Sequence, residues 1–163
     1  MKKNVIVSLA DSNYFELLNE LVDSIKSFEQ SKDTAICILD AGLSEQQRDI
    51  LSKKVDEIKS AEWDIDVPAF KVKGREWLKS QVSRAFLPKY FPSYEKFLWI
   101  DCDAWVADWN SIELYFKACE NGKLGITQTF TPGYKIMSKV NWLFGKVAII
   151  KSQNFKHAIK SKI

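Results

Sequence analysis

Three short apolar runs constrain the fold of this chain more than any other feature of its sequence. They cover residues 5–10, 34–39 and 96–100, and each is followed directly by an aspartate. Runs of this length that stop at a polar residue are typical of strands buried in a parallel sheet. Between the runs, apolar residues recur at helical spacing. The alternation of strand and helix predicts an α/β fold with a mainly parallel sheet flanked by helices.

Local patterns predict where the other elements lie. Apolar residues from Leu18 to Ile25 recur at the spacing of one helix face, which indicates a first helix. Ser44 and Gln47 form a capping-box pattern that begins a second helix, and the apolar stripe of that helix extends to Ile58. Further helices are expected over residues 74–86, 110–119 (with Asn110 as the cap) and 153–159, and further strands over residues 64–67, 69–72, 123–126 and 146–150.

The composition indicates one folded domain over residues 1–163. Hydrophobic residues make up 46% of the chain and charged residues 28%, which excludes a disordered or low-complexity protein. The net charge of +3 is too balanced to indicate a nucleic-acid-binding protein. The cysteines form no CxxC pair and no apolar segment is long enough for a membrane span, so we expect a cytoplasmic protein. Its lysines would allow peripheral contact with the inner face of a membrane.

Aspartates follow all three apolar runs. Asp11, Asp40, Asp101 and Asp103 lie within three residues of the end of a run. In open α/β sheets, ligands bind beyond the carboxyl ends of the strands. We therefore expect these four acids to converge on one edge of the sheet, and we expect the functional site there.

The segment Asp101-Cys102-Asp103 is the sharpest of these features. In an extended chain, residues i and i+2 point to the same side, so both carboxylates would face one point. Two like charges in that arrangement favour a cation between them, and hard oxygen ligands suit Mn²⁺ or Mg²⁺. A nucleotide pyrophosphate would supply further ligands. A solvated turn with two incidental acids is the simpler alternative.

A phosphatase of the haloacid dehalogenase type is a second functional interpretation of this motif. There the first aspartate is a nucleophile and the second a general acid. Such enzymes carry the motif near the start of the chain and need further acids over a long stretch. Here the motif begins at residue 101, and after Asp108 the remaining acids are Glu113 and Glu120. The phosphatase is therefore the less favoured alternative.

Four segments in this order resemble a known enzyme family. They are Ala10–Tyr14 (ADSNY), Ile38–Ser44 (ILDAGLS), the pair Ser83-Arg84, and Leu98–Asp103 (LWIDCD). With these segments the chain resembles a family 8-like glycosyltransferase of the GT-A fold, similar to glycogenin and to bacterial lipopolysaccharide galactosyltransferases. The resemblance is strongest up to about Val106. It implies a Rossmann-like nucleotide-diphospho-sugar transferase fold.

The resemblance also implies a donor-binding pocket after the first strand. Leu9, Asp11 and Asn13 would line the base and ribose pocket, where Asp11 would accept a hydrogen bond from a uracil N–H. Tyr14 would lie near the base. Arg84 would steady the donor through charge-assisted hydrogen bonds.

The resemblance implies a metal-dependent reaction. Asp101 and Asp103 would hold Mn²⁺ (or Mg²⁺), which bridges the donor diphosphate and stabilises the departing nucleotide; Asp101 would also contact the donor. The implied activity is transfer of a hexose from a nucleotide diphosphate sugar, UDP-linked, to a glycan or glycolipid acceptor. Retention at the anomeric carbon is implied as well.

The chain departs from the family pattern in its last quarter. Phe144 and Lys146 stand where the family has Asn and Gly against the donor sugar. The family also carries a late histidine ligand in a further acceptor-binding region, whereas His157 here is expected at the surface. A non-catalytic or truncated nucleotide-sugar-binding domain is therefore the competing hypothesis. We expect the 163-residue chain to bind the donor and turn it over slowly.

Overall fold

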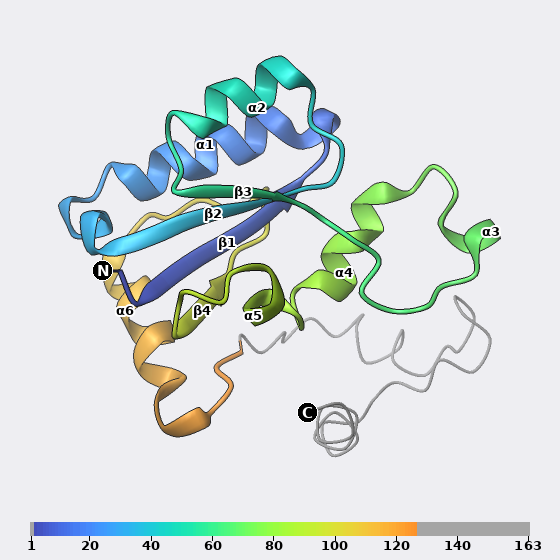
Figure 1. The fold of residues 1–163 in the computed structure, drawn as a ribbon. Helices are drawn as coiled ribbons and strands as arrows, with labels where there is room; N and C mark the ends of the chain where they lie inside the picture. Colours follow the sequence, from blue (N-terminus) through green and yellow to red (C-terminus); the bar gives the residue numbers. More distant parts are fainter. Residues whose placement is uncertain (1, 127–163) are drawn as a thin grey trace, which may run out of the picture. The chain divides into compact units, whose positions relative to one another are not determined.

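Four parallel strands form the sheet within residues 2–126, the part of the chain that this computed structural model describes (Figure 1). They are β1 (Asn4–Ala10), β2 (Thr34–Asp40), β3 (Glu57–Ser60) and β4 (Lys96–Trp99), in the order β3-β2-β1-β4. All three neighbouring pairs are parallel. The α/β fold with a parallel sheet is thus confirmed. The chain separates into two units, residues 1–125 and 126–163, and the sheet belongs to the first.

The register of β1 with its two neighbours positions the carboxyl edge of the sheet. All seven residues of β1 pair with β2. On its other side β1 pairs with β4 only as far as Val7, which lies opposite Trp99. Residues 8–10 of β1 therefore extend beyond the last residue pair with β4. The chain after β4 leaves the sheet beside this extension.

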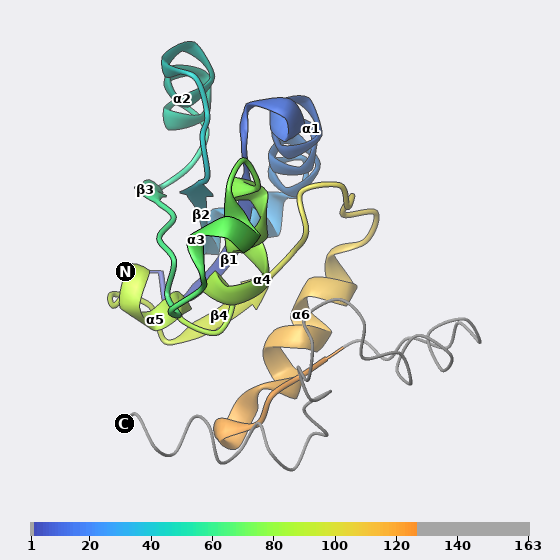
Figure 2. The same cartoon turned by 90° about the vertical axis from the view of Figure 1, so that its right-hand side faces the viewer.

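Three helices pack on one face of the sheet. They are α1 (Phe15–Lys26), α2 (Glu45–Ser52) and α6 (Trp109–Ala118), and Figures 1 and 2 show α1 and α2 side by side. Their apolar stripes meet alternate residues of β1 and β2 in one buried cluster that includes Ile6, Leu18, Ile38, Leu51 and Phe116. Each fully buried side chain of this size contributes about 1.5–3 kcal/mol. This cluster holds the helices that flank the carboxyl edge.

The opposite face of the sheet packs against α5 (Leu87–Tyr90) and the residues that follow it. Val5, Val7 and Leu9 alternate with the residues of the first cluster, so they point to this second face and contact Phe91 and its neighbours. The α5 helix contains Pro88 near its start, where a missing N–H costs nothing.

Two helix starts test the capping predictions. The capping box is present, since Ser44 Oγ accepts from the Gln47 N–H and the Gln47 side chain accepts from the Ser44 N–H. The prediction that Asn110 caps α6 is wrong. Asp108 caps this helix, because its carboxylate accepts a hydrogen bond of 3.1 Å from the Asn110 N–H.

The prediction that the second helix reaches Ile58 is wrong, because α2 ends at Ser52 and residues 57–60 form β3. Ile58 pairs with Ile38 on the free edge of β2. Just before it, the Asp56 carboxylate accepts a hydrogen bond of 2.9 Å from the Ile36 N–H. The backbone groups on this edge of β2 need partners, and that requirement prevails over helical spacing.

The segment between β3 and α5 also differs from expectation. No strand forms over residues 64–67 or 69–72. Instead the chain contains α3 (Ala69–Val72), a 3₁₀ turn (Glu76–Leu78) and α4 (Lys79–Ser83). Figure 1 shows α3 and α4 beyond the carboxyl ends of the strands. The physical reason is that Asp64 is bound by side chains of α5, which keeps this segment away from a sheet edge.

The last described residues contain no strand over 123–126, contrary to the prediction. A 3₁₀ turn (Glu120–Gly122) with Asn121 and Gly122 at positive φ ends the α6 region. The expected strand 146–150 and helix 153–159 lie outside the described residues.

Candidate functional site at the carboxyl edge of the sheet

The strand order defines a reversal point between β1 and β4. From β1 the chain passes to β2 on one side, whereas β4 is added on the other side, so the order reverses between β1 and β4. Parallel sheets bind ligands at this reversal point, beyond the carboxyl ends of the strands. Asp11 follows β1, and Asp101 and Asp103 follow β4. These acids therefore flank the reversal point.

Asp11 organises the turn that leads into α1. Its Oδ1 accepts hydrogen bonds from the N–H groups of Asn13 (2.9 Å) and Tyr14 (3.3 Å). Asp11 thereby caps a 3₁₀ turn (Ser12–Tyr14) that continues into α1. Within residues 2–126, its other oxygen has only a long contact of 3.5 Å with the Asn13 side chain. The sequence allowed either a cap or a ligand contact, and the cap leaves one oxygen for a ligand.

The neighbouring site candidates differ in accessibility. Asn13 and Tyr14 are exposed beside Asp11. Leu9 is only 4% exposed and packs in the cluster on the α5 side of the sheet. Its side chain therefore belongs to the core and is not exposed at the carboxyl edge.

Asp40 does not join the other acids as a free carboxylate. One of its oxygens accepts from the N–H groups of Gly42 (2.8 Å) and Leu43 (2.7 Å), and the other accepts from the Arg48 guanidinium at 2.8 Å. Both oxygens are thus engaged in closing the turn from β2 into α2. Asp40 thus lies at the expected edge, opposite Ala10, but backbone donors of its own turn and Arg48 occupy its oxygens.

The Asp101-Cys102-Asp103 segment is a turn. The Ala104 N–H donates to the Asp101 carbonyl at 3.0 Å, so residues 101–104 are not extended. The strand alternation that was expected to aim both carboxylates at one point therefore does not apply. Asp103 is exposed and makes no hydrogen bond or ion pair with residues 2–126. Its carboxylate is available to a ligand.

Arg84 and Trp99 meet at Asp101. The Arg84 guanidinium lies 5.0 Å from the centre of the Trp99 ring and contacts Asp101 Oδ1 at 3.3 Å. The indole N–H of Trp99 donates to the same oxygen at 2.7 Å. Sequence reasoning expected Arg84 at this edge and missed Trp99. The i, i+2 relation of Trp99 to Asp101 at a strand end was the signal that could have found it.

The acids act together on Cys102. Burial raises the pKa of this thiol from 9.0 to about 11, and the charges of Asp103, Asp101 and Asp11 contribute in the same direction. The thiol therefore stays protonated at neutral pH. Since three carboxylates, from the turns after β1 and β4, raise the pKa of one thiol, the electrostatic environment here favours a cation.

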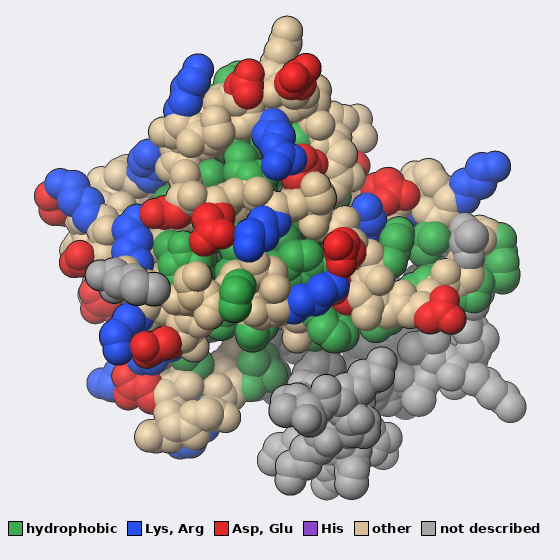
Figure 3. Space-filling view, viewed as in Figure 1, with side chains coloured by type: hydrophobic (Ala, Val, Ile, Leu, Met, Phe, Trp, Pro, Cys, Tyr) green, Lys and Arg blue, Asp and Glu red, His purple; other side chains and the backbone are tan. Residues whose placement is uncertain are grey.

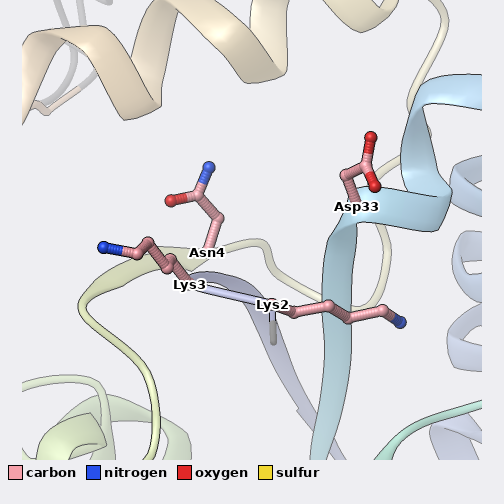
Figure 4. A pocket seen from close by; sticks show the side chains of 4 residues that line it. All are labelled: Lys2, Lys3, Asn4 and Asp33. Carbon is pink, nitrogen blue, oxygen red and sulfur yellow. The ribbon is translucent and has the colours of Figure 1, made fainter.

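Two hollows lie at the opposite end of the sheet, where the strands begin. One of about 360 Å³ is lined by Lys2, Lys3, Asn4 and Asp33 (Figure 4), and the second also contains Asn4 and Asp33. In Figure 4 the two lysine side chains point away from each other. These hollows contain none of the acids at the carboxyl edge.

The sequence of the chain matches the family model for glycosyl transferase family 8 over residues 5–157. The chain belongs to glycosyl transferase family 8. This membership, together with the parallel sheet, confirms the resemblance and the Rossmann-like GT-A fold that it implied.

Two solved structures of LgtC are similar to this family 8 chain. One is an active-site mutant, and the other is the galactosyltransferase in complex with donor and acceptor sugar analogues. Each is 25% identical in sequence and has a TM-score of 0.49, with 66% of this chain and 41% of the LgtC chain covered. The chain thus spans less than half the length of these proteins. No curated protein matches it significantly.

The carboxylates at the carboxyl edge of this family 8 chain suit a divalent cation that is also bound by phosphate oxygens. Residues 2–126 contain no group of three or more His, Cys, Asp or Glu side chains arranged to hold a metal. Asp103 and the Oδ2 atom of Asp101 are nevertheless oxygen ligands without a donor in this part of the chain. Mg²⁺ and Mn²⁺ accept such a site, since they are commonly bound by one or two carboxylates plus phosphates. The residues therefore fit the expected ion.

Other expectations concern the surface and the end of the chain. No helix among the described residues is long and apolar enough to cross a membrane. Figure 3 shows acidic and basic side chains interspersed over the face seen in Figure 1. None of the cysteines, all within the described part, forms a disulfide. Phe144, Lys146 and His157 lie outside the described residues.

Proposed function

We propose that this chain binds a nucleotide diphosphate sugar, UDP-linked, together with Mn²⁺ (or Mg²⁺) at the reversal point between β1 and β4, beyond the carboxyl ends of these strands. The bound hexose would be transferred to a glycan or glycolipid acceptor. The observation that supports this most is the reversal of strand order, which is flanked by Asp11 on one side and by Asp101 and Asp103 on the other. Family 8 membership is consistent with it.

The nucleoside would occupy the β1 side of the reversal point. The oxygen of Asp11 that makes only the 3.5 Å contact can accept a hydrogen bond from a base N–H. Asn13 and Tyr14 present exposed polar and aromatic groups next to it. The Asp11 cap fixes the backbone of this turn, so little conformational entropy is lost when a base binds.

The diphosphate would occupy the β4 side. Asp101 and Asp103 would hold the metal ion, which on binding would neutralise charge that develops on the departing nucleotide. Arg84 is positioned by its contacts with Trp99 and Asp101, so its guanidinium can donate to phosphate oxygens in a fixed orientation. The protein thus offers two negative charges to the metal and one positive charge to the phosphates.

A thermal-shift experiment tests donor binding. UDP at a hundred times its dissociation constant should add about 2.7 kcal/mol of stability, and only when Mn²⁺ is present. Asp103→Asn should remove the stabilisation that needs Mn²⁺. Asp33→Asn is the matched control, because this exposed acid lies at the opposite end of the sheet. An unchanged melting temperature with every nucleotide plus Mn²⁺ would overturn the proposal, and stabilisation by phosphate monoesters alone would favour the phosphatase.

Turnover separates a transferase from a donor-binding domain. We expect the 163-residue chain to release UDP slowly from UDP-hexose donors with Mn²⁺, because water can replace an acceptor. Catalysis depends on holding the acceptor beside the anomeric carbon, which contributes many kcal/mol through effective molarity. Asp101→Ala should abolish the release. Complete absence of release by a chain that binds UDP would favour the non-catalytic alternative.

A further inference from the structure

We infer that Trp99 is a positioning residue of the metal site, which restricts Asp101 to monodentate coordination and thereby favours Mn²⁺ and Mg²⁺ over Ca²⁺. The inference rests on the proposed function and adds a residue and a selectivity to it.

The first step is the hydrogen bonding of Asp101. Its Oδ1 accepts from the Trp99 indole N–H at 2.7 Å and from the Arg84 guanidinium at 3.3 Å. Both donors therefore occupy lone pairs of a single oxygen. Oδ2 has no donor among residues 2–126. A cation that approaches this carboxylate finds one oxygen free and one already engaged.

The second step is the rigidity of Trp99, whose indole N–H binds Oδ1 of Asp101. Trp99 is the last residue of β4, and its ring packs against the buried cluster on the α5 side of the sheet. The Arg84 guanidinium lies over the same ring at 5.0 Å, and its Nε donates to the Ser80 carbonyl at 2.9 Å. The indole thus contacts both Arg84 and Asp101. A flexible donor from solvent could not fix Oδ1 in this way.

The third step is the preference of the ions. Mg²⁺ demands near-ideal octahedral geometry with short bonds, whereas Ca²⁺ takes six to eight oxygens and often binds carboxylates in a bidentate manner. An Asp101 carboxylate that offers one oxygen suits the smaller ions. When the indole N–H is removed, Oδ1 keeps only the longer contact with Arg84, so one of its lone pairs becomes available and the site should tolerate bidentate coordination.

The test measures Mn²⁺ binding by the full chain with UDP present. Electron paramagnetic resonance detects the free Mn²⁺, and competition with Ca²⁺ gives the preference between the two ions. Trp99→Phe keeps an aromatic ring and loses the N–H. We expect it to bind Mn²⁺ about tenfold more weakly, within the range seen when partners of metal ligands are removed. The preference for Mn²⁺ over Ca²⁺ should fall as well. Trp99→Tyr serves as a second variant, and Trp77→Phe, at a half-exposed tryptophan in the turn before α4, is the matched control.

A second readout does not involve the metal. In a ¹H–¹⁵N spectrum of the protein without metal, the Trp99 indole resonance, assigned by its loss in Trp99→Phe, should shift in Asp101→Ala. The inference is overturned if Trp99→Phe and Trp99→Tyr bind both ions as the wild type does. It is also overturned if the indole resonance does not shift in Asp101→Ala. A wild-type chain that binds no Mn²⁺ even with UDP would instead overturn the proposed function, and this inference with it.

Discussion

The hydroxyl of Tyr90 donates a hydrogen bond of 2.7 Å to the carboxylate of Asp64, whose side chain is only 1% exposed. The other Asp64 oxygen contacts the Lys89 ammonium at 2.9 Å, and the Tyr90 oxygen also accepts from the Glu62 N–H at 3.0 Å. These bonds fasten the segment after β3 onto α5. They therefore hold α5 and the segment after β3 together on this side of the sheet.

Tyr90→Phe should lower the free energy of unfolding by about 1–3 kcal/mol, because it leaves the Glu62 N–H and one Asp64 oxygen without their partner. Urea denaturation measures the change. Tyr14→Phe, at an exposed tyrosine, is the control for loss of a hydroxyl. If Tyr90→Phe were as stable as the control, these bonds would not stabilise the fold.

Gln47→Ala should affect stability and UDP binding together. The Gln47 side chain accepts from the Ser44 N–H at 2.9 Å and donates to the Ser12 carbonyl at 3.1 Å, so it links the cap of α2 to the turn after Asp11. We expect a loss of about 1 kcal/mol, typical of a helix cap, and weaker binding of UDP with Mn²⁺. Ser44→Ala removes the cap and retains the link to Ser12. It should therefore lower stability and leave UDP affinity closer to that of the wild type.

Asp40→Asn should lower stability without affecting Mn²⁺ binding, and Asp103→Asn should do the reverse. The Asp40 carboxylate closes its own turn and pairs with Arg48, so its substitution should cost about 1–2 kcal/mol of stability and leave Mn²⁺ affinity unchanged. Asp103 has no partner in the described part of the chain, so its substitution should spare stability and abolish Mn²⁺ binding. Calorimetric titration with Mn²⁺ and UDP, beside urea denaturation, distinguishes the two. Loss of Mn²⁺ binding in a folded Asp40→Asn protein would show that Asp40 is a ligand.

Stability should decrease in alkali because of Cys37. Burial raises the pKa of this thiol from 9.0 to about 12, and the charges of Glu57 and Asp56 add to the effect. The folded state keeps the thiol protonated while the unfolded chain ionises it near pH 9. The contribution is therefore complete below pH 9 and is lost as pH rises toward 12, by at most about 1.4 kcal/mol per pH unit.

Cys37→Ala removes this group, so the stability of the variant should depend less steeply on pH between 9 and 11. Tyr94, whose pKa is also raised by burial and by its contact with Cys37, accounts for part of the remaining slope. Melting temperatures measured across this range provide the comparison. Identical slopes in the variant and the wild type would contradict the assignment to Cys37.

The sequence predicted the parts of the fold that local rules determine. The three apolar runs became β1, β2 and β4, and the Ser44 and Gln47 pattern became a capping box. The predictions from the sequence failed where contacts between distant segments decide the structure. Ile58 continues the helical spacing of α2, but residues 57–60 pair with β2 as a strand. Residues 64–67 were expected to form a strand, but the Asp64 side chain is hydrogen-bonded to Tyr90 of α5.

The sequence indicates where the candidate site should lie, but not the hydrogen bonds within it. That acids follow the strands was readable from sequence, and the strand order explains why the edge matters. Asp40 and Asp101 follow strands in the same way, yet one is bound by its own turn and the other by an indole and a guanidinium. Such hydrogen-bond partners depend on the geometry of the folded chain, which residue spacing does not specify.

The short pairing of β4 links ligand binding to local unfolding. Within residues 2–126, β4 pairs only with β1, and over only four residue pairs. Strands held by few backbone hydrogen bonds open more readily than the centre of a sheet. A ligand that bridges the β1 turn and the β4 turn would bind only while β4 is paired. Amide hydrogens of residues 97–100 would then exchange more slowly in the bound protein, so donor affinity and the opening equilibrium of this sheet edge would be thermodynamically coupled.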